Sequence, residues 1–285
     1  MRRADVLIEV QELADLIAAG TGPVVADCRF ALTDPAAGER AWREAHIPGA
    51  HYLHLARDLS GPRAGVGGRH PLPDARHFTA TMRRIGLDAG RLLVACDASR
   101  GAYAARLWWL ARHFGHASVR FLDGGWDAWC AAGLARDALQ PVAAAGNFTA
   151  RADARARVDY DELVQMRVSG AAPRLIDSRE ARRYQGLEEP IDPVAGHIPG
   201  AANRPWAEAT DAGGFFLDEA AHAARWRGLG PASGLVVYCG SGVTACVNLV
   251  SLALAGLDGA RLYPGSWSDW CSRMGAPIAT GTDPG

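Results

Sequence analysis

The cysteine best placed for chemistry follows a short apolar run and precedes a glycine-rich turn. The run VVYCGSGVTA (236–245) sets Cys239 after a strand-like stretch and before a helix that we expect to begin near Thr244. Gly240 and Gly242 allow the backbone to fold back tightly. Amide N–H groups in such a turn point inward, and a helix N-terminus adds partial positive charge, so both favour a thiolate. We therefore predict that Cys239 is a nucleophile and that the same cradle would hold its persulfide anion.

Other interpretations of this cysteine fit the same residues less well. A cysteine phosphatase needs an arginine six positions after the cysteine to grip the phosphoryl oxygens, and that position is Ala245. A buried structural cysteine has no need of a Gly-Ser-Gly turn at the end of its strand. The six cysteines include no CxxC pair and no Cys/His cluster with zinc spacing, so we expect no metal site.

The chain contains two copies of one pattern. The sequence HIPGA occurs at 46–50 and again at 197–201, and each copy is preceded by an apolar run with an acid, VVADCR and RLIDSR. Each copy ends alike, with FLDGGWDAWC in the first and LYPGSWSDWC in the second. We predict two domains, 1–140 and 155–285, joined by a linker near 137–157 that is rich in Ala, Arg, Asp and Gly.

Short apolar runs alternate with amphipathic stretches within each copy. This alternation predicts an α/β fold in which each domain has a mainly parallel sheet with helices on both faces. Ligands of such sheets bind beyond the carboxyl ends of the strands, which is where Cys239 lies.

The first copy has CDASRGAY where the second has the glycine-rich turn. Two alignments are open, since either Cys96 or Asp97 can take the position of Cys239. Both alignments leave the first copy without the two-glycine turn, so we expect it to be chemically degenerate.

The paired HIPGA boxes, the CGSGVTA loop and the GSWSDW ending resemble the tandem-domain rhodanese-type sulfurtransferases, closest to those that use 3-mercaptopyruvate. The resemblance spans nearly the whole chain. It implies two rhodanese-like domains, with Asp97 at the cysteine position of the first and the catalytic loop in the second. Gly240, Ser241, Gly242, Val243 and Thr244 match the mercaptopyruvate version of the loop, whereas thiosulfate-using members carry basic residues there.

The resemblance also implies partners for Cys239. Arg183, in RRYQG, would bind the donor's carboxylate, while His70, in GGRHPLP, would hydrogen-bond Ser241 across the two domains. Asp58 is a possible replacement for the acid that completes this relay in the family. The chain departs from the family at Ile191, where a second donor-binding arginine is common, so either the donor is a different one or another arginine substitutes.

The expected activity is sulfur transfer from 3-mercaptopyruvate, through a Cys239 persulfide, to cyanide, a thiol or a thioredoxin-like acceptor. Two alternatives stay open: a thiosulfate:cyanide sulfurtransferase, and a non-catalytic persulfide carrier or sensor. We expect no metal or organic cofactor, and the absence of lysine excludes a Schiff base or a Walker-type loop.

The charge and the N-terminal sequence indicate which partners and which cell compartment to expect. The formal net charge of -1 points to neither nucleic acid nor an anionic membrane. The N-terminus, MRRADVLIEVQEL, does not resemble a secretion signal, so a reducing cytoplasm with free thiols is expected.

Overall fold

The computed structural model describes residues 1–20 and 22–284, and the chain divides into two compact units. Unit 1 comprises Met1–Gly61, Pro73–Asp153 and Thr210–Leu217, and unit 2 comprises Pro62–Leu72, Ala154–Ala209 and Asp218–Gly285. The main division falls inside the segment that the sequence marks as a linker. Two short segments cross between the units. Segment 62–72 belongs to unit 2, although its neighbours in sequence belong to unit 1, and segment 210–217 belongs to unit 1, although its neighbours belong to unit 2.

The sheet of unit 1 is wholly parallel, with strand order β1-β5-β4-β2-β3. Its strands are short runs of apolar and β-branched residues: β1 (Leu7–Ile8), β2 (Val24–Asp27), β3 (His51–Tyr52), β4 (Leu93–Cys96) and β5 (Val119–Leu122). β2 and β4 are buried along their whole length, as expected of central strands covered on both faces.

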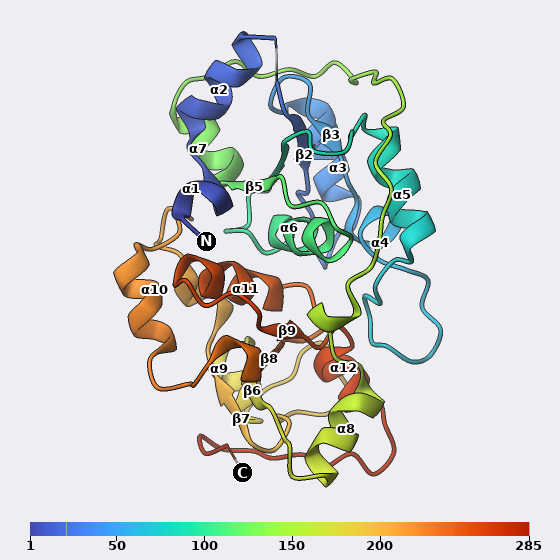
Figure 1. Cartoon of the computed structure of the whole chain (residues 1–285), viewed down its shortest axis with the longest axis vertical. Coiled ribbons are helices and arrows are strands. Elements are labelled where there is room, and N and C mark those ends of the chain that lie inside the picture. The colour runs from blue at the N-terminus through green and yellow to red at the C-terminus, as the bar shows by residue number, and fades with distance from the viewer. Residues whose placement is uncertain (21, 285) are drawn as a thin grey trace. The chain divides into compact units, whose positions relative to one another are not determined.

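Seven α-helices of unit 1 surround this sheet: α1 (Arg3–Val6), α2 (Val10–Ala18), α3 (Ala37–Glu44), α4 (Leu55–Asp58), α5 (Ala75–Arg84), α6 (Ala104–His113) and α7 (Gly125–Ala131). On one face, Leu13 of α2 and Trp129 of α7 join a core cluster with Val25 and Val94 of the central strands. α6 packs on the other face of the sheet (Figure 1). The two layers of helices confirm the α/β class.

Unit 2 repeats this design with four parallel strands in the order β7-β6-β8-β9. The strands are β6 (Arg174–Asp177), β7 (Ala201–Asn203), β8 (Leu235–Tyr238) and β9 (Arg261–Leu262). Its helices are α8 (Tyr160–Val168), α9 (Ala181–Tyr184), α10 (Glu219–Trp226), α11 (Ala245–Leu254) and α12 (Ser266–Trp270), with short 3₁₀ turns at Ala154–Ala156, Trp206–Ala209 and Ala232–Gly234.

The two faces of the unit 2 sheet are covered by different helices (Figure 1). Leu163 of α8 and Trp270 of α12 pack on Val236 and Tyr238, and α11 lies against β8 and β9. Every residue of α11 is buried, and its sequence is apolar except for Asn248 and Ser251, whose side chains make hydrogen bonds. Among the described residues, no helix combines the length and the apolar character needed to cross a bilayer.

Residues that repeat in both copies hold the backbone in place. Asp27 and Asp177 each bind the arginine two residues further along the chain. His46 and His197 each present Nδ1 to a backbone carbonyl oxygen, at 2.6 and 2.8 Å. All four are nearly inaccessible to solvent, so these contacts stabilise the folded chain.

Strand register relates the two catalytic-loop positions. Asp27 of β2 pairs with Cys96 of β4, and Asp177 of β6 pairs with Tyr238 of β8. The residues that follow these strands, Asp97 and Cys239, therefore occupy the same place in the two sheets. Their carbonyl oxygens also accept matching backbone hydrogen bonds, from Trp126 at 2.8 Å and Trp267 at 3.0 Å.

The turn after β4 closes around the Asp97 carboxylate. One carboxylate oxygen accepts hydrogen bonds from the backbone N–H of Ser99 at 2.8 Å and of Gly101 at 3.0 Å. The other accepts from Tyr103 and Ala104, both at 2.9 Å. Because Asp97 is 1% exposed, these four donors replace water as its solvation shell. The strand-to-helix turn of unit 1 is thus a built anion cradle, permanently occupied by its own side chain.

Replacing Asp97 by Ala should destabilise unit 1, because four buried or partly buried amide groups lose their acceptor. We expect a loss of about 3–5 kcal/mol in the free energy of unfolding, and a smaller loss for Asp97→Asn, which keeps one oxygen. Urea unfolding of the full chain, with hydrogen exchange of unit 1 amides, measures it. The exposed Asp127 supplies a control, since Asp127→Ala should change stability by less than about 0.5 kcal/mol. A loss below about 1 kcal/mol for Asp97→Ala would contradict this account of the cradle.

Candidate active site

Cys239 follows β8 directly and is 2% exposed. Its backbone N–H donates to Ser266 Oγ at 3.1 Å, and its carbonyl oxygen accepts from Trp267 at 3.0 Å. The next carbonyl, that of Gly240, accepts from Ser268 at 2.9 Å. The turn that opens α12 therefore fixes the backbone on both sides of the sulfur.

Ser266 adopts a conformation that is rare for a residue with a side chain. Its φ is +55°, in the left-handed region, and its hydroxyl both donates to the carbonyl of Tyr263 at 2.9 Å and accepts from Cys239. Strain of this kind persists where the surrounding contacts over-determine it. The strained residue here is one that anchors the cysteine backbone.

The glycines of the loop allow its backbone to pass close to neighbouring segments. Gly242 has a φ of +72°, and a Cβ there would lie 2.3 Å from the carbonyl oxygen of Pro264. Val243 is buried, and Thr244 precedes the first residue of α11, Ala245. The helix thus begins where the sequence predicts it, six residues after Cys239 and one residue sooner than α6 begins after Asp97.

Ser241 and His70 form a buried pair beside the cysteine. Ser241 Oγ lies 2.8 Å from His70 Nδ1, and the two residues are 7% and 5% exposed. His70 belongs to segment 62–72, which is part of unit 2 although it lies far upstream in sequence. The predicted contact is therefore made inside one unit.

Segment 62–72 is attached to the same turn that holds Cys239. The backbone N–H of Gly67 donates to Asp269 Oδ1 at 3.0 Å, and that of Arg69 donates to Ser268 Oγ at 3.1 Å. Gly68, with a φ of +80°, passes so close that a Cβ would lie 2.4 Å from the carbonyl oxygen of Gly265. One turn consequently positions both the cysteine and the histidine segment.

The three arginines of the DSREARRYQG stretch have different surroundings. Arg179 is 1% exposed and binds Asp177 and Glu189. Arg182 is exposed and pairs with an exposed glutamate. Only Arg183 turns toward the cysteine loop: a Cβ built on Gly240 would lie 3.4 Å from its Nη2 and 3.6 Å from its Nη1.

Glu189 holds Arg183 in this orientation. Its carboxylate accepts from Arg183 Nη2 at 2.7 Å and from the backbone N–H of Ile191 and Asp192. Burial by itself would raise the pKa of Glu189, but the hydrogen bonds and the positive charge of Arg183 outweigh it, so the pKa lies below its usual value. Glu189 is therefore ionised at neutral pH and acts as a fixed counter-charge.

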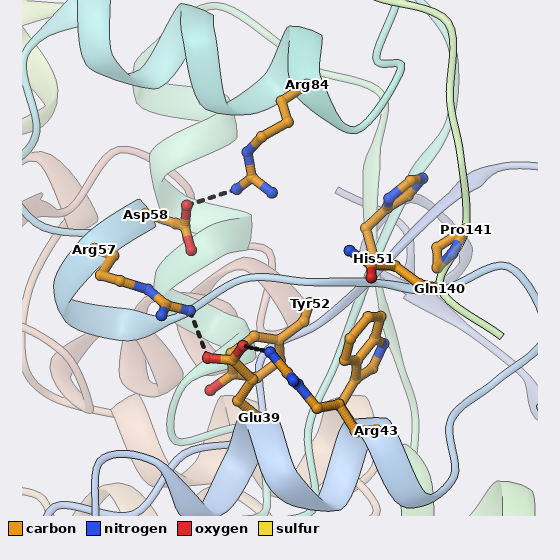
Figure 2. Close-up of a pocket in the computed structure, with 10 residues that line it drawn as sticks. Glu39, Arg43, His51, Tyr52, Arg57, Asp58, Arg84, Gln140 and Pro141 are labelled. Carbon is orange, nitrogen blue, oxygen red and sulfur yellow. Dashed lines mark hydrogen bonds and ion pairs between the residues drawn. The ribbon is translucent and has the colours of Figure 1, made fainter. Parts of the chain in front are cut away.

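Asp58, the third member predicted for the relay, lies in unit 1. Its Oδ1 accepts from Arg84 at 2.6 Å, and its Oδ2 accepts from the backbone N–H of His54 at 2.7 Å. Asp58 lines a unit 1 pocket of about 380 Å³. Figure 2 shows its carboxylate directed at Arg84, next to Arg57, which pairs with Glu39. These contacts give Asp58 a local role, as an anchor for α4 and α5.

Arg69 is the residue that sequence reasoning missed. Its Nη2 would lie 3.0 Å from a Cβ on Gly240, nearer than any atom of Arg183. The sequence contained one signal for it, because Arg69 directly precedes His70 in GGRHPLP.

Three of the other cysteines have environments that disfavour the thiolate. Burial raises the pKa of Cys28 and Cys96 well above the usual thiol value, and it raises the pKa of Cys271 to about 11. All six cysteines are free thiols. Over residues 1–20 and 22–284, no three His, Cys, Asp or Glu side chains gather in a group that could hold a metal ion.

The assembled geometry combines a thiol at a strand end, a serine–histidine pair and arginines turned toward the same loop. A site of this kind suits nucleophilic attack by sulfur on a small anionic donor.

Comparison with known proteins identifies the class. The rhodanese-like domain matches residues 9–132 and 159–273. A Pseudomonas aeruginosa protein named as a probable 3-mercaptopyruvate sulfurtransferase is 47% identical over 265 residues, covering 90% of this chain and 92% of that protein. A Mycobacterium tuberculosis protein, SseB, provisionally named as a thiosulfate sulfurtransferase, is 38% identical over 282 residues, 98% of this chain and 99% of that one. The solved structure of Escherichia coli SseA, described as a 3-mercaptopyruvate sulfotransferase, matches with a TM-score of 0.78 at 29% identity, covering 92% of this chain and 98% of that chain.

The chain belongs to the rhodanese-like family, with two copies of the domain, as the resemblance in its sequence predicts. It is a sulfurtransferase enzyme, and its relatives include 3-mercaptopyruvate sulfurtransferases.

Ser241→Ala and His70→Ala should each lower the kcat of sulfur transfer by roughly 100-fold, as expected on losing a positioned proton-transfer group. Because the two side chains share one hydrogen bond, the double variant should be little worse than either single variant. Steady-state kinetics of the four proteins measures this, with the exposed Ser169→Ala as control. Losses that multiply in the double variant would show that the two residues act independently.

Proposed function

We propose that this enzyme is a 3-mercaptopyruvate sulfurtransferase that carries sulfur as a persulfide on Cys239. The observation that carries the proposal is the hydrogen bond between Ser241 and His70 beside the cysteine. Sulfur removal from mercaptopyruvate breaks a carbon–sulfur bond, and the departing enolate carbon must receive a proton. Thiosulfate releases sulfite, which needs none, so a proton-handling pair in the loop favours the carbon-based donor.

The first half-reaction starts from the Cys239 thiolate. It attacks the sulfur of the donor thiol, the carbon–sulfur bond breaks, and its electron pair leaves on the pyruvate enolate. The donor's thiol proton, relayed by Ser241 and His70, is transferred to the enolate carbon. The products are pyruvate and Cys239–S–S⁻, so the charge on the enzyme's sulfur is unchanged.

The persulfide anion requires the same solvation as the thiolate. In unit 1 the equivalent turn solvates an Asp97 carboxylate through four backbone amides. That arrangement supports an amide cradle around the outer sulfur of Cys239. It also supports a first domain that does not catalyse sulfur transfer, because Asp97 has no sulfur atom to form a persulfide.

The second half-reaction regenerates the enzyme. A nucleophile attacks the outer sulfur, the sulfur–sulfur bond breaks, and Cys239 leaves as a thiolate; with cyanide the product is thiocyanate. A small thiol or a thioredoxin-like protein would accept sulfur in the same way. Neither half-reaction requires a metal or an organic cofactor. We also propose that the enzyme acts in the cytoplasm.

A second candidate donor is thiosulfate. The arginines that face Gly240 and the name of the Mycobacterium tuberculosis relative favour it. A non-catalytic persulfide carrier or sensor is the remaining alternative, and it would accept one sulfur without turning over.

Cys239→Ser should abolish turnover with either donor, because the hydroxyl cannot form a persulfide. The measurement is thiocyanate and pyruvate formation from each donor, with Cys130→Ser as an active control. Without acceptor, mass spectrometry should find the wild-type Cys239 peptide heavier by one sulfur atom. Faster turnover with thiosulfate would overturn the assigned donor, and a loaded Cys239 without turnover would point to the carrier.

Arg183→Ala should raise the KM for mercaptopyruvate by about 10- to 100-fold, because a charge-assisted contact to the donor carboxylate is lost. The value of kcat should change much less. Arg182→Ala is the matched control, since this neighbouring arginine pairs only with an exposed glutamate. An unchanged KM would remove Arg183 from the donor site.

A further inference from the structure

Two guanidinium groups converge on the first residue after the cysteine. A single point, the Cβ position of Gly240, lies 3.0 Å from Arg69 Nη2 and 3.4 Å from Arg183 Nη2. The two arginines come from distant parts of the chain, but both belong to unit 2. Their side chains are 20% and 11% exposed, so water only partly screens their charge.

One carboxylate, that of Asp192, lies against both arginines. Its Oδ1 accepts a hydrogen bond from Arg69 Nη1, and its Oδ2 lies 3.5 Å from Arg183 Nη2. Oδ2 is buried and, within the described part of the chain, accepts no hydrogen bond. Asp192 is itself held by its backbone N–H, which donates to Glu189 at 3.1 Å. The acid is thus fixed beside two cations, with one oxygen incompletely satisfied.

The formal charges of the buried and half-buried members of this cluster cancel. Its cations are Arg69, Arg179 and Arg183, and its buried anions are Asp177, Glu189 and Asp192. A further anion, Glu180, lies 3.7 Å from Arg183, but its side chain is 54% exposed and water screens its charge. Of the three anions, Asp192 is the one that contacts both arginines facing the loop. Removing its charge would leave a net charge of one positive unit next to Gly240.

We propose that Arg69 is a second donor-binding arginine and that Asp192 sets the charge of the donor site, so that a monoanionic donor is selected over a dianionic one. This inference rests on the proposed function. The two Nη2 atoms can each donate to one oxygen of a donor carboxylate. Asp192 orients Arg69 for this contact through Nη1 and leaves Nη2 directed at the loop.

The same arrangement explains discrimination by charge. A monoanion such as mercaptopyruvate gains the two charge-assisted hydrogen bonds and adds one negative charge to a neutral cluster. Thiosulfate adds two negative charges next to the fixed Asp192 carboxylate, and repulsion between like charges in a half-buried site disfavours it.

The Arg69 assignment is tested with Arg69→Ala, Arg69→Lys and the control Arg182→Ala in the full chain. Arg69→Ala should raise the KM for mercaptopyruvate by about 10- to 100-fold, and Arg69→Lys should restore part of it, because lysine keeps the charge but not the planar fork. Sulfur transfer from preloaded persulfide to 2-mercaptoethanol, a neutral acceptor, should stay within about twofold of wild type. An unchanged KM, or an equal loss in both half-reactions, would overturn the role of Arg69 in donor binding.

The Asp192 assignment has an independent test in Asp192→Asn, which keeps the size of the side chain and removes its charge. The ratio of kcat/KM for thiosulfate to that for mercaptopyruvate should rise by about tenfold. An unchanged or lower ratio would overturn the charge-selection role, even if Arg69→Ala failed to fold.

These outcomes are separable from those of the proposed function. If the wild-type enzyme releases no pyruvate from mercaptopyruvate, the proposed donor fails, whatever the variants do. If the wild type turns over normally while the Arg69 and Asp192 variants match it with both donors, only the present inference fails.

Discussion

The structure depends on one recurring constraint, the turn that leads from a central parallel strand into a buried helix. Such a turn leaves several backbone amides pointing inward, away from water, and they need an acceptor. Unit 1 satisfies them with the Asp97 carboxylate, whereas unit 2 places Cys239 at the same point. In the proposed reaction, Cys239 would become an anion at the position where unit 1 holds a carboxylate.

A second turn, at the start of α12, brings the other residues of the candidate site to the cysteine. Ser266 anchors the cysteine backbone, while Ser268 and Asp269 anchor the upstream segment that carries Arg69 and His70. Because one short element anchors both sides, it fixes the thiol relative to Arg69 and His70. Such preorganisation lowers the cost of assembling the transition state.

The sequence was informative where the information is local. Apolar runs and repeated motifs predict the parallel sheets, the duplication and the cysteine turn, and spacing within RRYQG singles out Arg183. The choice between Cys96 and Asp97 requires strand pairing, which two equally apolar runs cannot settle. Arg69 and Asp192 went unnoticed because their importance arises from contacts between residues far apart in the chain. The relay with Asp58 stays a prediction from the resemblance, and no local pattern reveals the hydrogen bond that its carboxylate accepts from Arg84.

Segment 62–72 comes from the first repeat but belongs to the compact unit of the second, and this has an evolutionary consequence. Gene duplication normally leaves the spare copy free to decay or to be deleted once it has lost its chemistry. Here the first copy encodes Arg69 and His70, which form part of unit 2, the compact unit of the second copy. A gene trimmed to the second copy alone would encode the nucleophile without these two side chains. Any constraint on the site around Cys239 therefore extends to the first repeat, which supplies Arg69 and His70, and the two repeats must be retained together.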